Sequence, residues 1–269
     1  DRLSETIPWM NEINMGATAI GTGITADPRY AEAVRMHLVE VTGIEMETAP
    51  NLIEATSDAG IFMTLSGTLK RGAVKLSKIC NDLRLLSSGP QAGLGEIFLP
   101  PRQAGSSIMP GKVNPVIPEV VNQVAFSVIG ADATVTAAAE AGQLQLNAFE
   151  PVIAHAILQS LMWMTNACYT LRVNCIEGIT PNLERLAMQV ETSVGVVTAL
   201  TPYIGYAAAA TLAHTALTTN ASIKDLVVEA GLMSPEKVAQ VLSPERLSGM
   251  VPLTGPLTLP IMVAREDQE

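Results

Sequence analysis

The feature that most constrains the fold is a long run, residues 113–171, that contains no lysine or arginine. Its acidic residues are also few: Glu119, Asp132, Glu140 and Glu150. A helix on the surface of a monomer needs a charged outer face, and helices formed by this run have almost none. The run must therefore be covered on most sides when the protein is assembled.

Three structures would cover such a run. A membrane span is disfavoured, because Glu150, His155, Gln159 and Ser160 interrupt any stretch long enough to cross a bilayer. A large monomeric core is hard to build from 269 residues. A helical bundle shared between subunits fits best, which predicts a homo-oligomer.

The positions of helix-capping and helix-breaking residues predict an all-α chain built on long helices. Capping residues, prolines and glycines delimit the expected helices, and no strand-like alternation of useful length or internal repeat is visible. Asn114-Pro115 is a capping signal at the start of one of them. The expected helices span residues 28–42, 52–87, 115–139 and 148–174.

The character of the chain changes after about residue 175, where prolines divide shorter helices with ordinary charge patterns. We predict a central bundle domain, shared between subunits, over residues 1–175 and a small helical domain over residues 176–249. Residues 250–269, with three prolines and an acidic end, are expected to form an irregular tail.

Composition excludes several classes of protein. The net charge of −10 and the scattered lysines and arginines argue against a nucleic-acid groove. Three cysteines without metal-like spacing indicate free thiols in a reducing cytoplasm, and no signal peptide is visible. Because the chain opens with Asp1 inside an expected helix, we interpret it as a piece of a longer protein.

The segment Gly105–Asn114, which reads GSSIMPGKVN, concentrates the groups that an anion-handling site needs. Two hydroxyls, Ser106 and Ser107, precede a cation, Lys112, and an amide, Asn114, at the expected start of a helix, where the helix dipole favours negative charge. The alternative is a solvated turn with Lys112 on the surface. The remaining members of the expected flexible loop are Gly105, Ile108, Met109, Pro110 and Gly111.

This segment resembles the signature of the aspartase/fumarase superfamily. Residues 14–23 (NMGATAIGTG) resemble its glycine/threonine segment, and residues 81–90 (NDLRLLSSGP) resemble the helix that leads into its loop. Residues 142–147 (GQLQLN) are similar to its turn between two bundle helices. The motifs occur in the family's order and span most of residues 1–249.

The resemblance implies a lyase that eliminates across a carbon–carbon bond and releases fumarate. Residues 115–123 (PVIPEVVNQ) and 138–143 (AAEAGQ) look aspartase-like, which predicts elimination of ammonia from L-aspartate. The alternatives are a class II fumarate hydratase, an argininosuccinate-type lyase, and a catalytically incomplete fragment with an interaction role only.

The family's roles pass to matching positions of this chain. By resemblance, Ser106 is the base, Ser107 holds the reacting carboxylate, and Lys112 and Asn114 bind the other carboxylate. Glu119 matches a carboxylate that orients a histidine from elsewhere in the assembly. A helix-terminal acid favoured by the dipole is an equally good interpretation of Glu119.

Other residues are weaker candidates. Thr18 and Thr22 could contact a ligand, although a close-packed helix start is the favoured interpretation, and His155 is expected in the core. No spacing suggests metal ligands, and no cofactor is expected. The family's earlier substrate-binding residues do not occur in this chain, and its sites are assembled from several subunits of a homotetramer, so we expect this chain to hold only part of a site.

Overall fold

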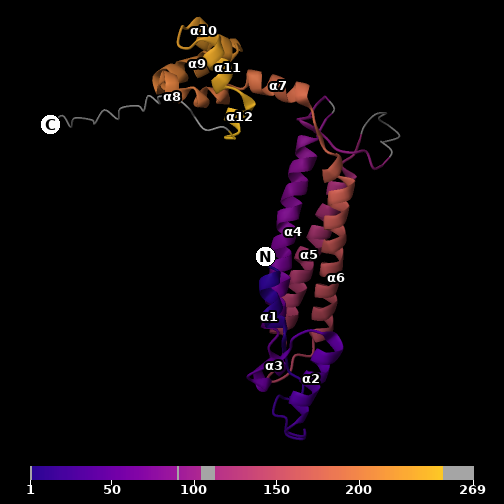
Figure 1. The fold of residues 1–269 in the computed structure, drawn as a ribbon. Helices are drawn as coiled ribbons and strands as arrows, with labels where there is room; N and C mark the ends of the chain where they lie inside the picture. The colour runs from indigo at the N-terminus through magenta and orange to yellow at the C-terminus, as the bar shows by residue number, and fades with distance from the viewer. Residues whose placement is uncertain (1, 90, 104–112, 251–269) are drawn as a thin grey trace, which may run out of the picture. The chain divides into compact units, whose positions relative to one another are not determined.

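The structure is a computed structural model that describes residues 2–89, 91–103 and 113–250. It confirms the all-α prediction, because the labelled elements are helices (Figure 1) and each strand within these residues is only two residues long. The chain divides into two compact units, Asp1–Thr180 and a second that begins at Pro181. The composition places the boundary slightly earlier, after residue 175.

The first unit is organised around three long helices that run side by side (Figure 1). They are α4 (Gly60–Leu86), α5 (Val116–Glu140) and α6 (Glu150–Asn174). On α5, the buried residues Ala125, Val128 and Val135 recur at helical spacing and pack with Leu69 of α4 and Ile153 of α6. The bundle of long helices expected from the sequence is therefore present within one chain.

The remaining elements of this unit are short. They are η1 (Ser4–Thr6), α1 (Ile7–Met10), β1 (Glu12–Ile13), α2 (Tyr30–Thr42), β2 (Glu47–Thr48), α3 (Leu52–Ser57), β3 (Ile97–Phe98) and η2 (Ile176–Gly178). Strands β1 and β2 pair in parallel. Strand β4 (Thr180–Pro181) lies at the junction of the two units.

The helix expected over residues 52–87 is two helices, and the prediction of one continuous helix is wrong. Asp58 is extended, with ψ 128°, and its carboxylate accepts a hydrogen bond from the Gly60 N–H at 3.1 Å. Asn51 caps α3 in the same way, accepting from the N–H groups of Ile53 and Glu54. A polar side chain that bonds its own backbone thus interrupts an otherwise helical pattern.

Two helix starts also differ from the sequence expectation. Helix α2 begins at Tyr30, because the Asp27 carboxylate accepts from the Arg29 N–H and forms a turn first; it ends before Gly43, whose φ is 68°, as expected. Helix α5 begins at Val116, and no side chain caps it. Asn114 accepts from the Val116 N–H through its backbone oxygen, so its expected capping role is wrong.

Helix α6 begins at Glu150, after a turn held by Asn147. The Asn147 side-chain amide donates to the carbonyls of Ala138 and Ala139, while the Asn147 Oδ1 accepts from the Phe149 N–H at 2.8 Å. Gly142 lies against this side chain, since a Cβ at that position would be 3.2 Å from Asn147 Cβ. The GQLQLN motif therefore works as the joint between α5 and α6.

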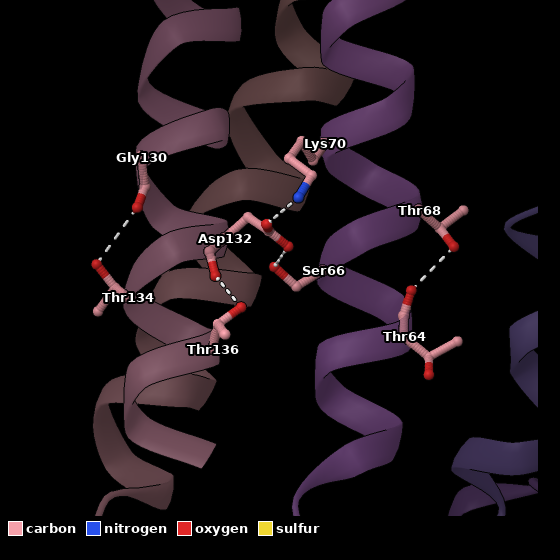
Figure 2. Close-up of polar contacts among 8 residues, drawn as sticks. All are labelled: Thr64, Ser66, Thr68, Lys70, Gly130, Asp132, Thr134 and Thr136. Atoms are coloured by element: carbon pink, nitrogen blue, oxygen red, sulfur yellow. Dashed lines mark hydrogen bonds and ion pairs between the residues drawn. The ribbon is translucent and has the colours of Figure 1, made fainter. Parts of the chain in front are cut away.

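Two buried polar contacts fix α4 against α5. Asp132 of α5 accepts from Ser66 Oγ at 2.9 Å and from Lys70 Nζ at 2.5 Å, both on α4 (Figure 2). Further along, the buried side chain of Asn122 donates to Ser77 and Asn81. Both contacts would be lost if one helix slid along the other, so they fix the register of the pair.

The second unit consists of short helices around its own core. They are α7 (Leu183–Thr192), η3 (Val194–Ala199), α8 (Thr201–Ile204), α9 (Tyr206–Thr219), α10 (Ile223–Glu229), α11 (Pro235–Val241) and α12 (Pro244–Leu247). Ser222 and Ser234 cap α10 and α11 through their hydroxyls. Leu200, Leu212 and Val227 lie at the centre of the core.

The outer sides of α5 and α6 are exposed in the single chain and carry large apolar residues. Phe126 is 60% exposed, and Leu158, Met162 and Tyr169 are also exposed. Among the described residues, α5 alone is long and apolar enough to cross a membrane, a test that the core helix of a bundle also passes. A surface of this composition is typical of an interface between subunits.

Candidate active site

The predicted site is carried by the segment that leads into α5. Asn114 and Glu119 are described by the structure, and both are half-buried. The other predicted site residues lie outside the described residues: Gly105, Ser106, Ser107, Ile108, Met109, Pro110, Gly111 and Lys112. The geometry of the site is therefore defined by the two stretches of chain that flank residues 104–112.

The two stretches meet at the C-terminal end of α6. One small cavity is lined by Leu99 and Pro100 from the preceding stretch, by residues 114–118 from the following one, and by Asn174 and Cys175. Residues 104–112 therefore connect two points that lie close together at one end of the bundle.

The preceding stretch is held at several points. Close to α4, the Gly95 N–H donates to Ser88 O at 2.8 Å, and the Glu96 N–H donates to Leu86 O at 2.9 Å. Farther along, the Arg102 guanidinium donates from Nε to Asn174 O at 3.0 Å and from Nη2 to Val173 O at 3.2 Å. This stretch is thus tied both to the end of α4 and to the end of α6.

The following stretch becomes helix α5. Asn114 lies just before the helix and Glu119 in its first turn, where the helix dipole favours a carboxylate. The structure therefore brings these two predicted site residues to the same end of α5, and the dipole alone is sufficient to account for the position of Glu119.

A polar network lies beneath this end of the bundle. Asn122, only 3% exposed, donates to Ser77 O, Ser77 Oγ and Asn81 Oδ1, and accepts from Arg84 Nη1 at 3.4 Å. Ser77, Asn81 and Arg84 lie on one face of α4, close to its end. The network joins the helix that precedes the segment to the helix that follows it.

The thiols near the site are protonated. Burial raises the pKa of Cys80 to about 11, and it also raises the pKa of Cys175. Because the thiolate is the nucleophile, neither group can attack a substrate at neutral pH. Both belong to a core cluster with Leu171.

The weaker candidates, Thr18, Thr22 and His155, do not have the surroundings that the sequence predicted. Thr18 is exposed and has a φ of 60°, and its hydroxyl donates to Ala17 O. The threonines lie in irregular chain rather than at a helix start, and Gly21 provides the close packing, since a Cβ there would be 2.3 Å from Ile53 Cα. His155 is exposed, which corrects the expectation that it lies in the core. Among the described residues, no three His, Cys, Asp or Glu lie close enough to hold a metal ion.

Three residues that fix the helices or the flanking stretches in place were not predicted from the sequence: Arg102, Asn122 and Asp132. Asn122 and Asp132 are polar residues within an otherwise apolar helix, and that contrast is the signal that could have identified them. Arg102 carries no comparable signal, because its partners are backbone carbonyls more than seventy positions away.

Comparison with known proteins was made with family models and with curated relatives. A family model described as Lyase matches residues 1–130, and one described as Fumarase C C-terminus matches residues 196–249. An aspartate ammonia-lyase from Pseudomonas aeruginosa is 56% identical over 92% of this chain and 52% of its own length. One from Escherichia coli is 52% identical over 91% of this chain and 51% of its own length.

Two solved structures share the fold. A fumarate lyase:delta crystallin from Brucella melitensis bound to cobalt superposes with a TM-score of 0.88 at 51% identity, covering 92% of this chain and 54% of that one. A class II fumarase from Schistosoma mansoni superposes with a TM-score of 0.86 at 30% identity, covering 92% and 55%.

The chain spans about half the length of the curated relatives that it matches. The two family models match residues 1–130 and 196–249 of the chain, and the superposed structures cover 92% of it. The chain belongs to the aspartase/fumarase superfamily.

Proposed function

We propose that the natural protein carrying this sequence eliminates ammonia from L-aspartate to give fumarate, in a reversible reaction. The observation that carries the proposal is the difference in identity between two kinds of relative. Curated relatives named aspartate ammonia-lyase are 52–56% identical to the chain, whereas the class II fumarase structure is 30% identical. We place this reaction in the cytoplasm.

The difficult step of such a reaction is removal of a proton from the carbon beside a carboxylate. This step places a second negative charge on that carboxylate, and loss of the amine from the neighbouring carbon then gives fumarate. The protein must supply a base for the proton and donors for the developing charge.

We assign the base to Ser106. A serine hydroxyl is too weakly acidic to act alone, so it requires donors that stabilise its alkoxide, a nearby cation and exclusion of water. Lys112 is the cation closest to it in sequence. Ser107 would hold the reacting carboxylate, and Lys112 and Asn114 the other one.

Glu119 is proposed to act indirectly, by orienting a histidine that this chain does not supply. Asn114 and Glu119 lie at the same end of α5, which supports this division of roles. At that end Asn114 can bind an anion, and the Glu119 carboxylate can orient an imidazole. No metal ion or cofactor is needed for these steps.

We further propose that the site is completed between copies of the protein in a homotetramer. The support is the uncharged outer side of α5 and α6, with Phe126 60% exposed in the single chain. A second copy packed there would cover this surface, as the lack of lysine and arginine in residues 113–171 requires.

The test is a substrate comparison on the purified natural protein. Formation of fumarate is followed by its ultraviolet absorbance with L-aspartate, L-malate or argininosuccinate as the substrate. We expect turnover of L-aspartate at least about 100-fold above turnover of the other two, a difference of about 2.7 kcal/mol in the barrier. Turnover of L-malate alone would instead establish a fumarate hydratase, and fumarate from none of the three would support the incomplete fragment.

A further inference from the structure

Arg102 joins the stretch of chain before residues 104–112 to the end of α6. The last carbonyls of a helix have no intrahelical partner, and they carry the negative end of the helix dipole. Val173 O and Asn174 O are two such carbonyls, and the Arg102 guanidinium donates to both, at 3.2 Å and 3.0 Å. The planar fork of arginine suits two neighbouring acceptors.

The residues just before Arg102 are packed at the same place. Leu99 packs on the core cluster that contains Cys80, Leu171 and Cys175. A Cβ on Gly178 would be only 3.0 Å from Pro100 Cγ, so the proline lies directly on that glycine. The chain is thus held by apolar packing at Leu99 and Pro100 and by hydrogen bonds at Arg102.

The stretch that follows residues 104–112 is anchored independently. Asn122, in the second turn of α5, is bonded to Ser77, Asn81 and Arg84 of α4. Residues 114–118 line the same small cavity as Leu99, Pro100 and Asn174. The stretch anchored by Arg102 and the stretch anchored by Asn122 therefore meet at the same small cavity. Arg102 lies four positions before Ser106 in the sequence.

We infer that Arg102 is a positioning residue for the reaction: its two hydrogen bonds to the end of α6 set the place from which the chain leads to Ser106. The inference rests on the proposed function, in which Ser106 is the base. The hydrogen bonds described for the Arg102 guanidinium go to Val173 O and Asn174 O, which makes it an anchor for the chain at the end of α6. It acts on the reaction through the backbone that follows it.

The test compares three variants of the natural protein. Arg102→Gln removes the charge and the fork, and Arg102→Lys keeps the charge but not the fork. Arg172→Gln is the matched control, because Arg172 lies at the same end of α6, where it pairs with Glu177 and lies over the Tyr169 ring, and it makes none of the Arg102 contacts described above. The readouts are kcat and KM for L-aspartate, Tm, and amide hydrogen exchange of peptides covering residues 103–113.

For Arg102→Gln we expect kcat to fall about tenfold or more, with KM within about threefold of the parent, because misplacement of a base costs transition-state stabilisation more than binding. Tm should stay within about 3 °C of the parent, since the contacts are exposed. Arg102→Lys should be intermediate, and Arg172→Gln should match the parent. Exchange at residues 103–113 should rise about fivefold in Arg102→Gln only.

Several results would overturn the inference. They are a kcat within about twofold of the parent, an equal loss in Arg172→Gln, a raised KM at constant kcat, and a Tm that falls by about 10 °C together with kcat. If the parent forms no fumarate, the proposed function fails and exchange decides the inference alone. Faster exchange in Arg102→Gln then supports the anchor, and unchanged exchange refutes it.

Discussion

At the scale of single residues, the account depends on a few polar side chains whose partners lie far away in the sequence. Asp132 contacts Ser66 and Lys70, and Asn122 contacts Ser77, more than forty positions earlier. Hydrophobic periodicity predicts which face of a helix is buried, but it does not predict which residues of another helix lie opposite. These contacts could not be predicted from the sequence, whereas Asn114 and Glu119 were singled out by their motif, and their roles stay predictions.

Asp132 provides a prediction at this scale. Asp132→Ala should lower the free energy of unfolding by about 2 kcal/mol, because it leaves Ser66 and Lys70 without their buried acceptor. The expected loss is below that of a fully buried pair, since the Lys70 side chain is 44% exposed. The measurement is urea denaturation at a fixed protein concentration.

The matched control is Asp82→Ala. Asp82 also pairs with a lysine, Lys78, but both side chains are exposed. Its loss should cost at most about 0.5 kcal/mol. Equal effects of the two substitutions would show that the contact at Asp132 does not fix α4 against α5.

At the scale of elements, the sequence predicted the long helices but not all of their limits. The end of α2 at Gly43 and the helix starts at prolines of the second unit were predicted, because glycine adopts the positive φ that ends a helix and proline fixes the φ of a first turn. The break at Asp58 was missed, because a side-chain bond to the local backbone decides it. The start of α5 at Val116 differs from the expected start because no side chain caps the helix, and the Val116 N–H donates to the backbone oxygen of Asn114. The uncharged face of α5 was predicted from composition alone.

That face gives the prediction at this scale. Phe126→Glu should dissociate the assembly of the natural protein, because a carboxylate would be buried at the centre of an apolar interface at a cost of several kcal/mol. Tyr206→Glu is the control, since Tyr206 is an aromatic residue of the second unit and is 74% exposed. Light scattering coupled to size-exclusion chromatography should show a smaller species for Phe126→Glu only. An unchanged mass would refute an interface at this face.

At the scale of the whole molecule, one end of the three-helix bundle carries every anchored part of the proposed site. The end of α4, the start of α5 and the end of α6 meet there, and the stretches that flank residues 104–112 are tied to them. Topology therefore explains how the two stretches that flank residues 104–112 can be held by helices of the first unit. The sequence predicted the motif and its chemistry. The structure shows the contacts that hold the stretches on either side of residues 104–112.

The most direct measurement is kcat for L-aspartate in Ser106→Ala, made in the natural protein beside Ser248→Ala, an exposed serine of the second unit. The account predicts a loss of about 10²–10⁴-fold for Ser106→Ala, the range of general base catalysis, and none for Ser248→Ala. A Ser106→Ala protein that keeps its turnover within about tenfold of the parent, about 1.4 kcal/mol, would contradict it.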